Sequence, residues 1–287
     1  MKHLNKFITE YIVKKKLDKF IDSEHDYKYF PKSKEELIEN IEELLKNDIY
    51  DFNCIDVSNI TDMSNLFNND IFYNISFDVS DWDVSNVTNM RNMFKECEFF
   101  NCDLSKWNVS NVTNMMGMFE YCQNFTGTGL DNWDVSNVKD MHNMFWRCEN
   151  FKGDKLKNWN VHNVENMSRM FMHCDKFDCD LSKWDVGNVT NMISMFFQCV
   201  NFNCDLSKWD VSNAEFTNSM FYSCYKLNCD LSNWNVSKVK NMDSMFYDCS
   251  NFKGEGLDNW NVSNVKYMRH MFENCKSLKN KPSWYEE

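Results

Sequence analysis

Cysteine stands at regular intervals along this chain, and thiolates bind soft metals and carry redox chemistry. The chain has thirteen cysteines in 287 residues. Eight occupy one column of a repeat, Cys97, Cys122, Cys148, Cys174, Cys199, Cys224, Cys249 and Cys275, and four form a second, Cys102, Cys179, Cys204 and Cys229. The array is either a metal ladder or thiol relay, or a row of small apolar side chains buried in the wall of a stack.

The spacing favours the buried side chains. No C-x-x-C pair occurs, a C-x4-C pair occurs in only four turns of the repeat, and the six histidines share no column. Gly127, Gly153 and Gly254 replace the second cysteine elsewhere, which indicates a position that needs a small residue. We therefore predict reduced, buried thiols, no metal site and no cofactor. The chain also lacks the common catalytic motifs, so we predict that it is not an enzyme.

The elements that position these columns follow from a tryptophan repeat. The tryptophans Trp82, Trp107, Trp133, Trp159, Trp184, Trp209, Trp234 and Trp260 are 25 or 26 residues apart. Ile55 takes the Trp place in a preceding divergent copy, and Trp284 closes the series. The repeat thus makes about nine turns, and each is numbered here from its Trp at position 0.

The spacing of apolar residues within each turn predicts one strand and one short helical segment. Valines stand at +2 and +5, Met at +8 and +11, Phe at +12, Cys at +15, and Phe or Leu at +18. From the first Met the offsets 0, 3, 4 and 7 match one face of a helix. The segment L-x-x-W-x-V, as in Leu104, Trp107 and Val109, matches the strand segment of a leucine-rich repeat.

The predicted fold is therefore an α/β repeat, a leucine-rich-repeat-like solenoid with a helical N-terminal cap. Residues 1–50 do not repeat and form the cap, and residues 51–287 form the solenoid with a short C-terminal cap. Leu4, Phe7, Ile8, Tyr11 and Ile12 make one amphipathic stripe in the cap. A second helix is predicted after Ser33, because Ser33 and Glu36 form a capping box before an apolar run.

The repeated block W-[DN]-V-S-N-V-T-N-M-x-x-M-F-x-x-C-x-x-F-N-x-D-L-S-x-W resembles the 26-residue repeat of bacterial surface proteins. That repeat defines the BspA-like group of leucine-rich-repeat proteins and also occurs in lipoproteins of mycoplasmas. The segment from residue 31 to residue 67 resembles the leader that introduces such arrays. The resemblance covers residues 31–283 and implies a repeat fold without enzymatic activity, with surface roles in adhesion or host protein contact among characterised relatives.

Composition excludes several classes of partner. A formal net charge of -12 argues against nucleic-acid binding, because phosphates need concentrated Lys and Arg. No apolar run reaches the length of a membrane span, and Glu10 and Lys14 interrupt the apolar patches of the N-terminus, unlike a signal peptide. With many reduced thiols, these features predict a cytoplasmic or otherwise intracellular protein; surface display, as in the relatives, is the alternative. The sequence does not indicate an oligomeric state.

The candidate binding surface is the polar face of the predicted strand, which consists of side chains one residue before and after each Trp. These candidates are Asp83, Lys106, Asn108, Asp134, Asn160, Lys183, Asp185, Lys208, Asp210, Asn235 and Asn261. Repeat proteins bind through such extended surfaces, so we predict a scaffold that binds another protein. A structural or adhesive spacer without a discrete ligand site is the alternative, because the face varies only mildly along the array. The Asn column at +4 is interpreted as structural, with its amides bonded to backbone groups at a corner.

Overall fold

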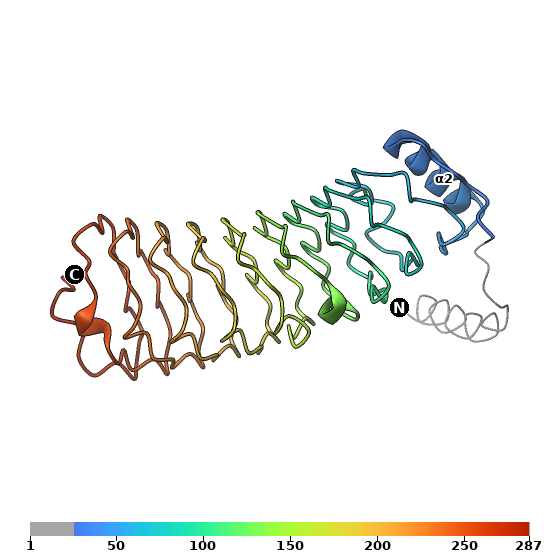
Figure 1. The fold of residues 1–287 in the computed structure, drawn as a ribbon. Coiled ribbons are helices and arrows are strands. Elements are labelled where there is room, and N and C mark those ends of the chain that lie inside the picture. The colour runs from blue at the N-terminus through green and yellow to red at the C-terminus, as the bar shows by residue number, and fades with distance from the viewer. Residues whose placement is uncertain (1–25, 287) are drawn as a thin grey trace, which may run out of the picture.

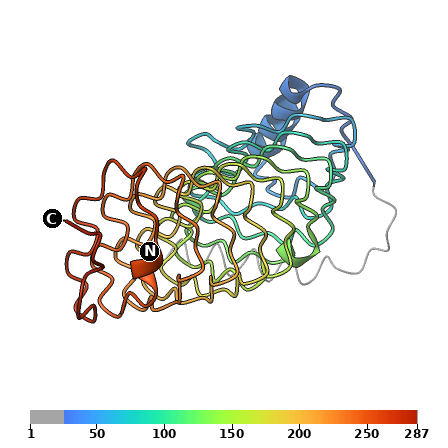
Figure 2. The same ribbon diagram turned by 60° about the vertical axis from the view of Figure 1, so that its left-hand side comes forward.

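The computed structural model describes residues 26–286, which form one elongated stack of coils, one coil for each repeat (Figure 1). The coils follow one another along the stack axis in both views (Figure 2). The described residues contain one α-helix, α2 (Lys34–Lys46), and two 3-10 helices, η1 (Leu130–Asn132) and η2 (Leu257–Asn259). In this range no segment forms an extended strand, and the coils are paired by isolated parallel bridges.

Eight of the ten bridges in residues 26–286 form one continuous column at position +7. Asp62 pairs with Asn89, Asn89 with Asn114, and the series continues coil by coil to Tyr267. Around it, the +6 amide donates to the +6 carbonyl of the preceding coil, as from Thr113 to Thr88 at 2.9 Å. The +8 amide donates to the +7 carbonyl of the next coil, as from Met90 to Asn114 at 3.0 Å. The coils are therefore stacked in register.

The segment predicted to be helical is a run of turns. The amides at the even repeat positions +10 and +12 donate to the next coil. Asn92 N lies 2.8 Å from the Met116 carbonyl oxygen, and Phe94 N lies 2.9 Å from that of Met118. The amides at odd repeat positions close turns within their own coil, as the Met93 amide at +11 does by donating to the Met90 carbonyl at 3.1 Å. The backbone at Asn92 is also left-handed, with φ of 53°. An α-helix needs each amide to bond four residues back, so it cannot form here.

The segment predicted to be a strand is also irregular. The Trp159 amide closes a turn on the Leu156 carbonyl at 3.0 Å, so it is not available to a neighbouring coil. The link to the preceding coil comes from the side chain, whose Nε1 atom donates to the Leu130 carbonyl oxygen at 2.8 Å. Each Trp from Trp82 to Trp284 donates in this way. The repeat is held here by indole groups rather than by a backbone ladder.

The predicted α/β solenoid with a helical cap over residues 1–50 is therefore wrong. Within residues 26–286 the repeat contains neither strand nor α-helix, and the one α-helix, α2, has 13 residues. The predicted helix after Ser33 is α2, and the Ser33 side chain accepts a hydrogen bond from the Glu36 amide as expected. The other half of the capping box differs, because the Glu36 carboxylate accepts from the Lys32 amide. The stripe from Leu4 to Ile12 lies outside the described residues.

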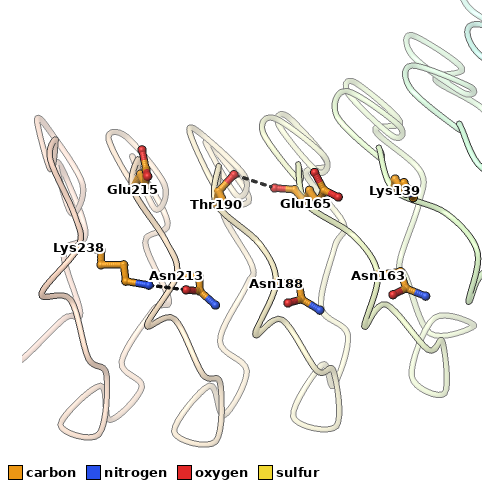
Figure 3. A pocket seen from close by; sticks show the side chains of 8 residues that line it. All are labelled: Lys139, Asn163, Glu165, Asn188, Thr190, Asn213, Glu215 and Lys238. Atoms are coloured by element: carbon orange, nitrogen blue, oxygen red, sulfur yellow. Dashed lines mark hydrogen bonds between the residues drawn. The ribbon is translucent and has the colours of Figure 1, made fainter.

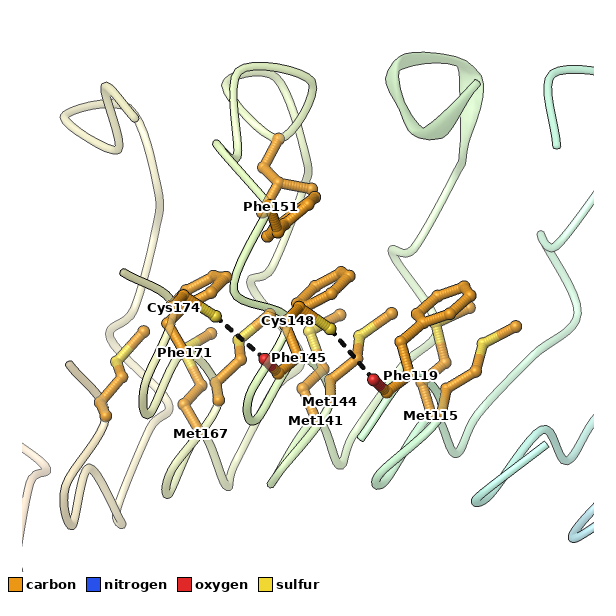
Figure 4. Close-up of a cluster of buried hydrophobic side chains, with 14 of the residues drawn as sticks. Met115, Phe119, Met141, Met144, Phe145, Cys148, Phe151, Met167, Phe171 and Cys174 are labelled. Carbon is orange, nitrogen blue, oxygen red and sulfur yellow. Dashed lines mark hydrogen bonds between the residues drawn. The ribbon is translucent and has the colours of Figure 1, made fainter. Parts of the chain in front are cut away.

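The core confirms which columns point inward. The Val, Met, Phe and Cys columns are buried through most of the stack, and the Phe rings at +12 stack between coils, with 5.6 Å between the centroids of Phe119 and Phe145 (Figure 4). The thiol of Cys148 donates to the Phe119 carbonyl oxygen at 3.0 Å, and that of Cys174 to the Phe145 carbonyl oxygen at 2.9 Å. At the N-terminal end, Leu37, Ile41 and Leu44 of α2 join the same core.

Candidate functional site

The predicted binding face lies on the surface, in two columns. Every candidate at +1, from Asp83 to Asn261, is exposed. One oxygen of each side chain is already engaged, because it accepts the amide two residues later; Ser85 N lies 3.0 Å from Asp83 Oδ1. The same bond recurs at Asn108, Asp134, Asn160, Asp185, Asp210, Asn235 and Asn261. The +1 column therefore has a structural role at the corner after each Trp, as Asx turns do.

The three candidate lysines do not form one cluster. Lys106 pairs with Asp81 at 2.5 Å, whereas neither Lys183 nor Lys208 has an ion pair within 4 Å among residues 26–286. Asp185 is instead paired with His162, whose Nδ1 atom lies 2.8 Å from Asp185 Oδ2. This hydrogen bond lowers the pKa of Asp185. Asp185 is thus bonded to a histidine outside the predicted face rather than to a candidate lysine.

A groove lies beside this face and is formed by the +4 and +6 columns, which were not predicted to be a binding surface. It has a volume of about 520 Å³ and crosses five successive coils (Figure 3). Its walls are polar and charged and come from Lys139, Asn163, Glu165, Asn188, Thr190, Asn213, Glu215 and Lys238. The two columns flank the inward valine at +5, so their side chains point outward on the same side of the stack (Figure 3).

The asparagines of the groove are held by the backbone. Asn163 Nδ2 donates to the Ser136 carbonyl oxygen at 2.7 Å, and Asn188 Nδ2 donates to that of His162 at 2.8 Å. The structural role predicted for the Asn column at +4 is confirmed. Thr190 is fixed in a similar way, since its hydroxyl donates to the Glu165 carbonyl oxygen at 3.2 Å. The polar walls of the groove are therefore ordered parts of the stack.

Charged side chains stand at intervals along the groove. Glu215 pairs with Lys240 at 2.5 Å, and the Lys238 ammonium donates to Asn213 Oδ1 at 2.6 Å. Lys139 and Glu165 have no ion pair within 4 Å among the described residues. The groove thus presents one carboxylate and one ammonium that are open to a ligand.

The repeat also places the chain among known sequences. A sequence model of the family described as "Mycoplasma protein of unknown function, DUF285" matches residues 33–154, 122–226, 147–256 and 215–286. The chain belongs to this family. The matches together span all coils of the stack, and they overlap because each covers several repeats. No curated protein matches the chain.

The thirteen cysteines of this DUF285 chain form no disulfide within residues 26–286. Burial raises the pKa of Cys204 to about 11 and that of Cys179 to about 12. A thiol with such a pKa stays protonated at neutral pH, and the protonated form is a poor nucleophile and a poor metal ligand. Over residues 26–286 no three side chains of His, Cys, Asp or Glu converge to hold a metal ion.

The helices found in residues 26–286 of this DUF285 chain are all short. Within the described part of the chain, no helix has the length and apolar character needed to cross a membrane.

Proposed function

We propose that this DUF285 chain is a non-enzymatic scaffold that binds another protein along the groove of the +4 and +6 columns. The observation that carries the proposal is the groove itself, which spans five coils and has ordered polar walls. A surface that repeats once per coil suits an extended partner, because the partner meets the same chemistry again in each coil.

Two further observations support a binding role. The repeat resembles that of the BspA-like group, and characterised members of that group have surface roles in adhesion or host protein contact. The buried, protonated thiols and the Asx turns of the +1 column both act in the architecture of the stack. The groove adds two charged side chains, Lys139 and Glu165, that have no ion pair within 4 Å among residues 26–286. We also propose a reducing compartment, because the thirteen cysteines, all within residues 26–286, form no disulfide there.

The test compares two threonines of one column. The hydroxyls of Thr190 and Thr113 each donate to a carbonyl of the preceding coil at 3.2 Å, but only Thr190 lines the groove. Thr190→Arg and Thr113→Arg should lower the melting temperature equally. We expect Thr190→Arg to abolish capture of partner proteins from cells of origin, and Thr113→Arg to leave it unchanged.

The outcome separates binding from a spacer role. If the two variants capture the same proteins in the same amounts, the groove does not bind, and a structural or adhesive spacer is the better description. Loss of capture by both variants would instead place the binding surface along the whole +6 column.

A further inference from the structure

The groove presents mainly hydrogen-bond acceptors to solvent, because its neutral donors are used inside the stack. The Nδ2 atoms of Asn163 and Asn188 donate to backbone carbonyls, which fixes the orientation of both amides. The Thr190 hydroxyl also donates to a carbonyl. The Oδ1 atoms of Asn163 and Asn188 accept no hydrogen bond from residues 26–286. A ligand that complements these walls must bring donors.

The chain itself shows which donor fits. Lys238 occupies the +4 place that asparagine holds in the coils before it, and its ammonium donates to Asn213 Oδ1 at 2.6 Å. A second column repeats this arrangement, since Lys176 takes an asparagine place and donates to Asn150 Oδ1 at 2.6 Å. In both columns, an ammonium binds the exposed amide oxygen of the preceding coil.

The one open carboxylate of the groove, Glu165, suits the same kind of donor, and the Lys139 ammonium lines the groove one coil before it. Glu165 stands beside the open amide oxygens and has no ion pair within 4 Å among the described residues. An ammonium bound to an ionised carboxylate forms a stronger hydrogen bond than a neutral donor does. The net charge of -12 also attracts a cationic segment over longer distances.

We propose that the groove binds the lysine ammonium groups of an extended partner segment, on Asn163 Oδ1, Asn188 Oδ1 and the Glu165 carboxylate. This inference rests on the proposed protein-binding function and names the chemistry of the partner. The acceptors recur about every 4.8 Å along the stack, so a segment lying along the groove meets several of them in succession. The flexible stem of lysine lets each ammonium reach the nearest acceptor.

The test uses the peptide Lys-Ser-Lys-Ser-Lys with a fluorescent label, and the same peptide with every lysine Nε-acetylated. Anisotropy titrations with the full chain should show saturable binding of the first peptide only. In Asn188→Lys, the new ammonium should bind Asn163 Oδ1 as Lys238 binds Asn213 Oδ1. The variant loses the bond from Asn188 to the His162 carbonyl but adopts an arrangement that the chain already contains, and it fills the groove. We expect this variant to bind the lysine peptide at least tenfold more weakly.

Asn86→Lys is the matched control. Asn86 belongs to the same column and makes the same backbone bond, at 2.8 Å to Ser58, but lies outside the groove. This substitution changes the net charge by the same amount, so we expect unchanged affinity. Equal weakening by both variants, or equal binding of the acetylated peptide, would overturn the lysine proposal. If the lysine peptide fails to bind while Thr190→Arg still abolishes partner capture, the lysine chemistry is wrong and the protein-binding function stands.

Discussion

At the scale of single residues, position in the repeat decides the environment of each side chain. A residue that recurs in every turn beside valine and phenylalanine has one environment, so the inward columns of Met, Phe and Cys could be assigned from spacing alone. The asparagines at +4 were assigned correctly to the backbone, yet they also line the groove. A side-chain amide has a donor nitrogen and an acceptor oxygen. The sequence does not show that the oxygen can still accept a hydrogen bond from a ligand after the nitrogen has donated to the backbone.

The buried cysteines make the stability of the stack sensitive to alkaline pH. Burial raises the pKa of the Cys179 thiol to about 12 in the folded chain, whereas a thiol in the unfolded chain titrates near about 8.5. Above the unfolded value, the unfolded chain loses a proton that the folded chain keeps, so stability is full below about pH 8.5 and falls as pH rises toward 12. Each such thiol contributes about 1.4 kcal/mol of lost stability per pH unit in this window.

Denaturant unfolding at pH 7.5, 9 and 10 measures the slope. Cys179→Ala should lower stability at pH 7.5 and also make the alkaline slope shallower by about 1.4 kcal/mol per pH unit. All other titratable groups are the same in both proteins, so the difference between the slopes isolates the thiol. Parallel slopes would mean that burial does not raise the pKa of Cys179 in the folded chain.

At the scale of elements, the sequence placed the right residues in the wrong secondary structure. The offsets 0, 3, 4 and 7 bring side chains to one face in a helix, but the turns of this repeat bring them to one face as well. What decides between the two is the acceptor of every second amide, which lies in the next coil. Spacing within one turn carries no information about that partner.

The variable length of the coils has a related cause. The three coils with glycine at +20 have 26 residues, and those with cysteine have 25. Gly127, Gly153 and Gly254 all have positive φ, and Gly127 and Gly254 precede η1 and η2 through a second glycine. Small size was therefore only part of the explanation, because glycine also supplies the left-handed backbone that accommodates the extra residue.

The glycine before η1 offers a direct test of this element. Gly129 has φ of 91°, and a Cβ there would lie 2.2 Å from the Ser105 backbone nitrogen. Gly129→Ala should therefore destabilise the stack by more than about 2 kcal/mol, since both strain and a backbone clash oppose it. Thermal melting followed by circular dichroism measures the loss.

Gly187→Ala is the comparison within the same chain. Gly187 does not have positive φ, and its nearest contact would be the Asp185 side chain at 3.2 Å. We expect a change within about 1 kcal/mol. If Gly129→Ala is equally mild, the left-handed turn before η1 does not limit the stability of its coil.

At the scale of the whole molecule, stability is shared along the stack. Every coil bonds through its backbone to the one before and the one after, and the indole and thiol bonds repeat with the same period. The number and register of the coils could be counted from the tryptophans, because stacking identical units forces one register. Which outward columns form the groove could not be predicted, because it depends on how the corners of successive coils align.

This register predicts that one whole coil can be removed. Deleting residues 184–208 joins Lys183 directly to Trp209 and leaves every column continuous. We expect a folded chain with cooperative unfolding and a lower melting temperature, because one set of neighbour contacts is lost. Small-angle scattering should show a particle shorter by about 4.8 Å. Deleting residues 190–208 instead places Trp209 at position +6, so valine and tryptophan columns are misaligned, and this variant should fail to fold. If both deletions behave alike, the register of the columns does not hold the coils together.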